Sequence, residues 1–399
     1  MKIIVPAVFQ RDFLEAVAPF PIDHLYGAIG GDVGLRAQQW LPQPKADELA
    51  SYVESARAKG IAFFYCLNVA CLGNREFTAE GQRWLVERLG WLDDLGVAGV
   101  VLSNPYLIAF AHKRFPRLRI AVSTATAIDS VDKAQFFEGQ GASVLYLPEY
   151  VNRDFPLLAQ IRKRTRAEIV LLSNVGSLLH CPIRNYHINL VSHSGESLEL
   201  GTYVDYPLMW CSREKGRDAG QMLKAPWIRP EDLGVYEEIG ITQFKLAGRE
   251  MDRPWVKRVA RAYAERHYEG DLNDLILGFD HLEPYGKLPI RIPNRALDGF
   301  LEFFRKKHDC RMGCRDCRYC DDFGAAVGVV EDAARNDFVD RVGRVAGGAA
   351  DTARCRRGDR CAARGRTRRH HRCLDQIQDG SSNETAVARH QPSASIRYG

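Results

Sequence analysis

Four cysteines stand close together near the end of the chain. The stretch 308–323 reads HDCRMGCRDCRYCDDF and contains Cys310, Cys314, Cys317 and Cys320, spaced C-x3-C-x2-C-x2-C. Thiols at this density can form disulfides, hold zinc, or hold an iron–sulfur cluster. Which of these uses applies decides much of the chemistry that the protein can perform.

The spacing of these cysteines separates the three uses. A structural zinc site usually takes two C-x2-C pairs with about a dozen or more residues between them. Here all four ligands would have to wrap one ion within a very short stretch. The C-x2-C-x2-C core is instead typical of thiolates that bind an iron–sulfur cluster. We therefore expect a [4Fe–4S] cluster, with zinc and unligated thiols as the alternatives.

Two earlier cysteines can supply a remote ligand. Cys181 in LLHCPIRNYH and Cys211 in LMWCSREKG each have polar or charged neighbours. Either one alone is as easily explained as a small buried residue. Together with the late cysteines they favour ligation. We expect four of these six thiols to bind the cofactor, and the spacing does not choose which four.

Apolar, β-rich runs alternate with amphipathic helical segments over roughly 250 residues. Near-continuous hydrophobic strands with helices between them predict βαβ units on a parallel sheet. Eight such strands favour a (β/α)8 barrel, and an open doubly wound sheet is the alternative. The runs are 2–8, 24–30, 61–69, 97–105, 119–127, 143–150, 168–176 and 242–248, and the clearest helical segments are 45–60, 79–96, 130–141 and 153–165.

The segment 177–240 interrupts this alternation between the seventh and eighth strands. In a barrel it would leave the C-terminal end of a strand, which is the active-site face, and loops of this length are commonly functional. We predict a barrel over 1–290 that includes the insertion, and a cysteine-rich segment over 291–322. Residues 323–399 are rich in Arg, Ala and Gly, which predicts a disordered tail and suggests translation of a GC-rich gene in a shifted frame.

The net charge of +5 resides in that tail. Residues 323–399 hold 14 arginines against 9 acidic residues, whereas residues 1–322 carry 41 of each sign. The charge of the folded part therefore gives no support for nucleic-acid binding. The N-terminus reads as a strand and a helix rather than a signal peptide, and no apolar run approaches a membrane span. We expect a cytoplasmic protein without a membrane span, whose thiols stay reduced.

Polar residues that follow the predicted strands should converge at the barrel mouth. Lys245 and Arg249 follow the eighth strand, and two cations there suit an anionic or carbonyl-bearing substrate. Glu149 follows the sixth strand and can act as an acid or base, or form a salt bridge with Arg249. We take Glu149, Lys245 and Arg249 as candidate catalytic residues.

Two stretches resemble the collagenase-like peptidase family, family 32 of the unassigned peptidases. They are LLSNVGSLLHCPIRNYHINLVSH (171–193) and WIRPEDLGVYEEIGITQFKLAGRE (227–250). The resemblance spans most of residues 1–322 and implies a (β/α) barrel, an inserted cysteine-bearing segment and a four-iron cluster. One position departs from it, because Ser177 stands where many relatives have cysteine.

The resemblance also implies a function. Better-understood members act in oxygen-independent hydroxylation of ubiquinone precursors or RNA bases. It thus implies a redox protein acting on a small-molecule or RNA-base substrate, with an electron donor, and it allows a heterodimer with a related family member. The family's name keeps a peptidase as the alternative, although the chain contains neither H-E-x-x-H nor G-x-S-x-G. A non-catalytic electron-transfer partner is the third interpretation.

Overall fold

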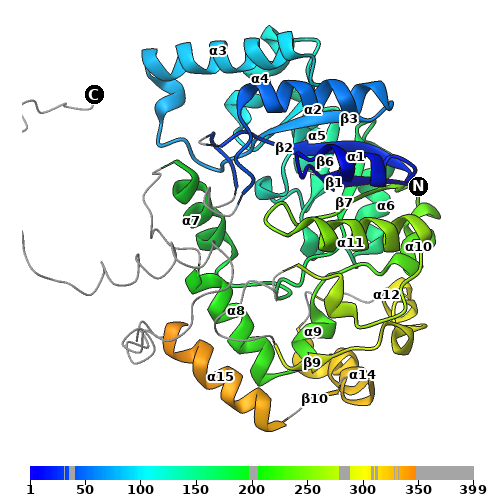
Figure 1. Cartoon of the computed structure of the whole chain (residues 1–399). Helices are drawn as coiled ribbons and strands as arrows, with labels where there is room; N and C mark the ends of the chain where they lie inside the picture. The colour runs from blue at the N-terminus through cyan, green and yellow to red at the C-terminus, as the bar shows by residue number, and fades with distance from the viewer. Residues whose placement is uncertain are drawn as a thin grey trace, which may run out of the picture. The chain divides into compact units, whose positions relative to one another are not determined.

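Eight parallel strands close into a barrel in the computed structural model of the chain (Figure 1). The strand order follows the sequence, and β1 pairs with β8 to complete the ring, so that Ile4 lies opposite Lys245. The strands are β1 (Lys2–Pro6), β2 (Ile22–Gly27), β3 (Ala62–Leu67), β4 (Gly99–Leu102), β5 (Arg119–Val122), β6 (Val144–Leu147), β7 (Glu168–Leu172) and β8 (Gln243–Lys245). All eight predicted strands and the predicted barrel are confirmed.

The structure describes residues 1–30, 32–35, 41–196, 205–277, 288–306, 310, 313–327, 329–330 and 332–346. Residues 1–349 form one compact unit. Within the described ranges, no helix combines the length and the apolar character needed to cross a membrane.

Helices fill the connections between successive strands. Those of the first seven strands are α1 (Arg11–Val17), α2 (Ala46–Ala58), α3 (Ala79–Leu95), α4 (Pro105–Arg114), α5 (Val131–Gly139) and α6 (Phe155–Arg164), and α11 (Arg253–Glu265) follows β8. Side-chain caps start several of them: Asn104 accepts from the Tyr106 N–H, and Asp154 from the Leu157 N–H. The four clearest helical segments of the sequence correspond to α2, α3, α5 and α6.

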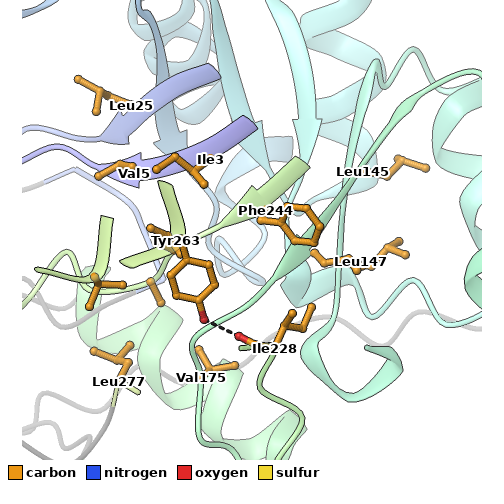
Figure 2. Close-up of a cluster of buried hydrophobic side chains, with 14 of the residues drawn as sticks. Ile3, Val5, Leu25, Leu145, Leu147, Val175, Ile228, Phe244, Tyr263 and Leu277 are labelled. Carbon is orange, nitrogen blue, oxygen red and sulfur yellow. Dashed lines mark hydrogen bonds between the residues drawn. The ribbon is translucent and has the colours of Figure 1, made fainter. Parts of the chain in front are cut away.

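Alternation along each strand divides the core into two layers. On β1, Ile3 and Val5 belong to the layer between the barrel and its helices, whereas Ile4 belongs to the barrel interior. Figure 2 shows part of the outer layer, where the Tyr263 hydroxyl of α11 donates to the Ile228 carbonyl at 2.6 Å. Because both faces of the strands are buried, the strands read as continuous apolar runs.

The insertion after β7 is mainly helical. It contains α7 (Arg184–Glu196), α8 (Asp205–Arg217), α9 (Gly220–Lys224) and α10 (Leu233–Glu237). Asn174, just beyond β7, is fully buried and bonds the Ala247 backbone through both its amide nitrogen and its oxygen. This side chain fixes the start of the insertion to the end of the last barrel strand.

The C-terminal part adds α12 (Glu302–Arg305), α13 (Cys314–Cys317), α14 (Tyr319–Val327) and α15 (Asp332–Ala346), with a small antiparallel pair, β9 (Ile290–Arg291) and β10 (Val329–Val330). We predicted a disordered tail from residue 323, but residues up to 346 continue the folded unit, and α15 packs along α8. Phe338 and Val342, one helical turn apart, are both fully buried. This amphipathic spacing is obscured by the Arg- and Ala-rich composition. Residues 347–399, with Cys355, Cys361 and Cys373, lie outside the described residues.

Phe338→Ala should weaken the contact between α15 and α8. The fully buried ring lies against Gly216 of α8, and its loss should lower the free energy of unfolding by about 3 kcal/mol. Phe136→Ala on α5 is the matched control, because that ring is 51% exposed and its removal should cost less than about 0.5 kcal/mol. Denaturant unfolding measures both variants, and equal losses would contradict this packing.

Candidate functional site

The four late cysteines line one cavity. Cys314 and Cys317 begin and end α13, a single turn between Gly313 at φ 98° and Arg318 at φ 53°. Cys310 lies before this turn and Cys320 lies in α14. The remaining walls include the rings of Phe303, Phe304 and Tyr319, three cationic residues, Arg153, Lys224 and Arg318, and the acidic residue Asp321. The thiols are thus gathered beside an aromatic wall and charged groups of both signs.

The thiols surround this cavity without converging on one point. No cysteine in the described part of the chain forms a disulfide, and no three His, Cys, Asp or Glu side chains there are placed to hold a single metal ion. Burial raises the pKa of the Cys320 thiol to about 12, so a thiolate needs a metal or a cation beside it. The open space is about 20 Å³, room for one water, so a four-iron cluster would require α13 to move outward.

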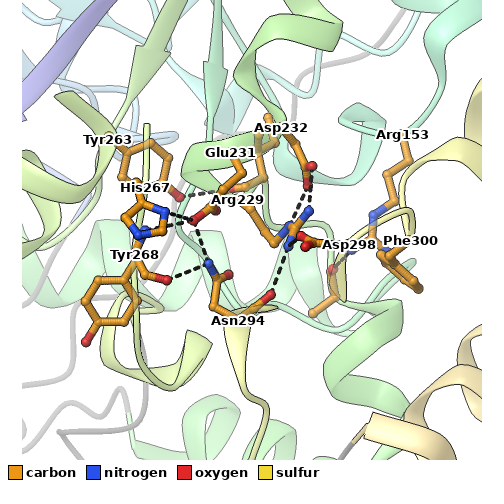
Figure 3. Close-up of polar contacts among 12 residues, drawn as sticks. Arg153, Arg229, Glu231, Asp232, Tyr263, His267, Tyr268, Asn294, Asp298 and Phe300 are labelled. Atoms are coloured by element: carbon orange, nitrogen blue, oxygen red, sulfur yellow. Dashed lines mark hydrogen bonds and ion pairs between the residues drawn. The ribbon is translucent and has the colours of Figure 1, made fainter. Parts of the chain in front are cut away.

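Arg153 reaches this cavity from the barrel side, just after β6. The side chain is 5% exposed, and its guanidinium donates to the carbonyls of Leu223 and Ala225, each at 2.6 Å. Three rings surround the guanidinium carbon, Trp227 at 4.8 Å, Phe304 at 4.9 Å and Phe300 at 5.0 Å. Figure 3 shows Arg153 beside Phe300. This one side chain therefore joins the barrel, the insertion and the C-terminal segment.

The two earlier cysteines belong to a separate group. Cys181 lines a second pocket, of about 230 Å³, with Glu149, Tyr150, His180 and Arg184. Its thiol lies within electrostatic range of Cys211 on α8, and burial raises its pKa. Neither Cys181 nor Cys211 lines the cavity of the four late cysteines. The six thiols that we predicted to share one site thus fall into a group of four and a group of two.

The two cavities share a wall. Leu179 lines the four-cysteine cavity, whereas Leu178, His180 and Cys181 line the second pocket. Successive residues of the segment 178–181 thus line different cavities, and this segment turns at Leu179 and His180, where His180 has φ 51°.

Glu149 pairs with a different arginine from the one expected. We considered a salt bridge to Arg249, but the Glu149 carboxylate accepts from Arg184 Nε at 3.1 Å. Arg184 also donates to the Thr124 carbonyl and lies over the Tyr150 ring. Although burial opposes it, the Glu149 carboxylate raises the pKa of Arg184, so the pair stays charged. Arg184, which belongs to the insertion, thus places a positive charge at the barrel mouth.

Lys245 and Arg249 do lie together. They flank the ring of Tyr26, with Lys245 Nζ at 2.8 Å and the Arg249 guanidinium carbon at 5.7 Å from its centroid. Arg249 is 8% exposed, and its buried Nη1 has no hydrogen-bond partner among the residues that the structure describes. Two cations and an unsatisfied donor at the C-terminal end of β8 form a site that suits an anionic or carbonyl oxygen.

A hydrogen-bonded chain lies beneath these cations, inside the barrel. His24 Nδ1 donates to Asp23 at 2.8 Å, and Nε2 accepts from the Tyr146 hydroxyl at 2.6 Å. Burial lowers the pKa of His24, and hydrogen bonds from His24 and Lys2 lower the pKa of Asp23 against the effect of burial. A neutral His24 therefore fixes the Tyr146 side chain through this hydrogen bond. Lys245 Nζ lies 5.2 Å from the centroid of the Tyr146 ring.

Comparison with known proteins gives the family. The family model described as Peptidase family U32 matches residues 14–171. An uncharacterized protease, MJ1657, of Methanocaldococcus jannaschii is 31% identical over 280 residues, which cover 70% of this chain and 81% of that protein. The chain belongs to peptidase family U32.

Solved structures give more distant likenesses. The U32 peptidase Mk0906 shares 22% identity at a TM-score of 0.47, covering 62% of this chain and 92% of that one. The citrate synthase SbnG shares 11% identity at a TM-score of 0.30, covering 65% of this chain and 90% of its own. The U32 model match ends at residue 171, so both thiol groups lie beyond it.

Several site residues of this U32 chain were not predicted from the sequence. Arg153 is one arginine in the helical stretch RDFPLLAQIRKRT, and Arg184 follows CPI in the insertion. Neither position carries a local signal, because their importance comes from partners far away in the chain. His24 and Tyr26 could have been found, since polar residues two apart in a buried strand point to the same interior.

His24→Gln should reduce the acid sensitivity of the fold. Because His24 stays neutral when folded, only the unfolded chain takes up its proton below about pH 6.5, so stability falls as the pH falls. This group contributes up to about 1.4 kcal/mol per pH unit, and the variant should lose that part of the slope. Urea unfolding between about pH 6.5 and pH 5 measures the slope, and identical slopes in variant and wild type would contradict a neutral His24.

Proposed function

We propose that this U32-family chain is an iron–sulfur protein that supports an oxygen-independent hydroxylation or a related redox reaction at the barrel mouth. The observation that carries the proposal is the gathering of Cys310, Cys314, Cys317 and Cys320 around one cavity with Arg153 and Lys224 in its walls. Soft thiolate donors select zinc or iron–sulfur clusters over harder ions. A cluster, once bound, would supply one-electron transfer.

The charge of the cavity walls supports an anionic centre. Four thiolates bring more negative charge than the metal atoms neutralise, and buried negative charge needs nearby cations. Arg153 provides one, whereas the charge of Lys224 is already matched by Asp218 at 3.4 Å and by Asp321. Zinc would use the same thiolates and remains the alternative cofactor.

The location of the cavity supports a redox role for the barrel mouth. Successive residues of the segment 178–181 line the four-cysteine cavity and the pocket that holds Glu149, Cys181 and Arg184. The insertion would therefore connect a bound redox centre to residues at the barrel mouth. The reaction also needs an external electron donor and substrate.

Within this proposal, Lys245 and Arg249 hold the substrate. Both cations lie near the Tyr26 ring, and the buried Arg249 Nη1 offers a hydrogen bond that no described protein group accepts. An anionic or carbonyl oxygen would satisfy it. Glu149 would serve as the acid or base, and its ion pair with Arg184 holds the carboxylate in place.

Single Cys→Ser variants test the cofactor and its ligands. The wild-type chain, purified without oxygen, should be brown, absorb at about 400 nm and contain about four irons with as many sulfides. Cys310→Ser, Cys314→Ser, Cys317→Ser and Cys320→Ser should each lose most of this iron. Cys71→Ser is the matched control and should keep it, as should Cys181→Ser and Cys211→Ser.

Two outcomes of that experiment oppose the proposal. A colourless wild-type protein with one zinc per chain would replace the cluster by zinc. Loss of iron in Cys181→Ser but not in Cys310→Ser would move the ligand set to the second pocket.

A peptidase is the second candidate, because His180 and Cys181 line one pocket with Glu149. A thiol, an imidazole and a carboxylate are the groups of a cysteine peptidase. Against it, burial raises the pKa of Cys181, whereas a nucleophilic thiol needs a lowered pKa, and Glu149 is engaged by Arg184.

Casein cleavage distinguishes the two candidates. We expect no cleavage above the background of a preparation that lacks the protein. Cleavage that disappears in Cys181→Ser but persists in Cys310→Ser would establish the peptidase and leave the redox proposal without its main support.

A further inference from the structure

Arg153 carries a buried positive charge that forms no ion pair with a carboxylate of the described residues, although Asp232 lies within electrostatic range. Its printed hydrogen bonds go to backbone carbonyls, those of Leu223, Lys224 and Ala225. Its Nε is buried and has no acceptor among the described residues. Carbonyl dipoles and aromatic faces attract a cation, but each supplies only a fraction of a counter-charge.

Arg229, the second buried arginine of this region, has carboxylate partners that compensate its positive charge. Arg229 is 2% exposed and donates to both carboxylate oxygens of Asp232, at 2.8 and 2.9 Å, and to Asp298 at 3.0 Å (Figure 3). Unpaired buried charge costs several kcal/mol, so folds normally place an acid beside such an arginine. Arg153 lies near the same aromatic ring, Phe300, yet receives no acid (Figure 3).

The groups within electrostatic range of Arg153 include the thiols of Cys320 and Cys310, together with Tyr236 and Asp232. Arg153 and the cysteines at positions 310, 314, 317 and 320 line the same cavity. Lys224 shares this cavity but is matched by Asp218 and Asp321, so its charge is already compensated. The negative charge that Arg153 lacks can therefore come from the four sulfurs once they are deprotonated and bound.

We propose that Arg153 is the buried counter-cation of the four-cysteine centre, a positioning residue that stabilises its anionic state and raises its reduction potential. The inference rests on the proposed function, since it needs a redox centre in this cavity. Reduction adds one electron from the external donor and makes the centre more negative. A fixed cation in a low-dielectric wall stabilises the reduced form more than the oxidised form.

Charge at position 153 can be varied at nearly constant shape. Arg153→Lys keeps a cation, whereas Arg153→Gln is neutral and keeps an amide donor for the Leu223 or Ala225 carbonyl. In Arg153→Gln the ratio of reduced to oxidised centre at a fixed poise should fall about tenfold, a shift of about 59 mV to lower potential for one electron. Arg153→Lys should stay within about twofold of the wild type. Dye-mediated redox titration of the anaerobically purified chain measures both, with iron and sulfide determined on the same samples.

Arg229→Gln controls for the loss of a buried arginine as such. It removes the ion pairs to Asp232 and Asp298 and should destabilise the fold, but Arg229 does not line the cavity and the potential should not move. If Arg153→Gln does not fold, Arg153→Met and Arg153→Lys are compared in the same titration, because both side chains are unbranched and of similar length but differ in charge.

The outcomes of this inference and of the proposed function are distinct. A neutral variant at position 153 with the wild-type potential and iron content would overturn the role of Arg153 and leave the cluster intact. An equal shift in Arg229→Gln would also overturn it, because the effect would then follow from stability. A wild-type chain that binds no iron would instead overturn the proposed function.

Discussion

Closure of the barrel between β1 and β8 is the constraint on which the rest of the molecule depends. Once Ile4 lies opposite Lys245, every second residue of each strand must point into one narrow interior. Several of these residues are polar, so they must satisfy one another without water. His24 bonds Asp23 and Tyr146, and Lys245 lies over two tyrosine rings. The candidate substrate site is thus the C-terminal end of a barrel interior in which the buried polar groups contact one another.

The same closure determines where the thiols can be. The insertion leaves the barrel at β7 and returns at β8, so it must pass over the mouth, carrying Cys181, Arg184 and Cys211. The C-terminal segment then packs against the insertion through Arg153 and its three rings. Neighbouring residues of the insertion, Leu179 and Cys181, consequently line the cavities of the two thiol groups.

The strands, the barrel and the place of the insertion followed from the sequence because burial on both faces leaves an unmistakable apolar pattern in each strand. The grouping of the cysteines did not follow, since the distance from Cys181 to Cys310 depends on how the insertion folds back. Glu149 was placed at the mouth by its position after β6, but its partner, Arg184, comes from 35 residues further along the chain. The helical segment after residue 322 was missed because Phe338 and Val342 are sparse among arginines and alanines. The patterns within single helices and strands could therefore be predicted from the sequence, whereas the contacts between distant elements could not.

The contacts of Arg153 also constrain the order in which the newly synthesised chain can fold. The residue leaves the ribosome with β6, but the carbonyls that bind it belong to α9, and two of its rings, Phe300 and Phe304, emerge only after the barrel strands are complete. Until then its guanidinium can remain hydrated at the surface of a nascent barrel. Its burial can be completed only after these two rings have been synthesised, and the four cysteines follow them directly in the sequence. The part of the cavity that faces away from the barrel is thus made by a segment that is synthesised after all eight barrel strands.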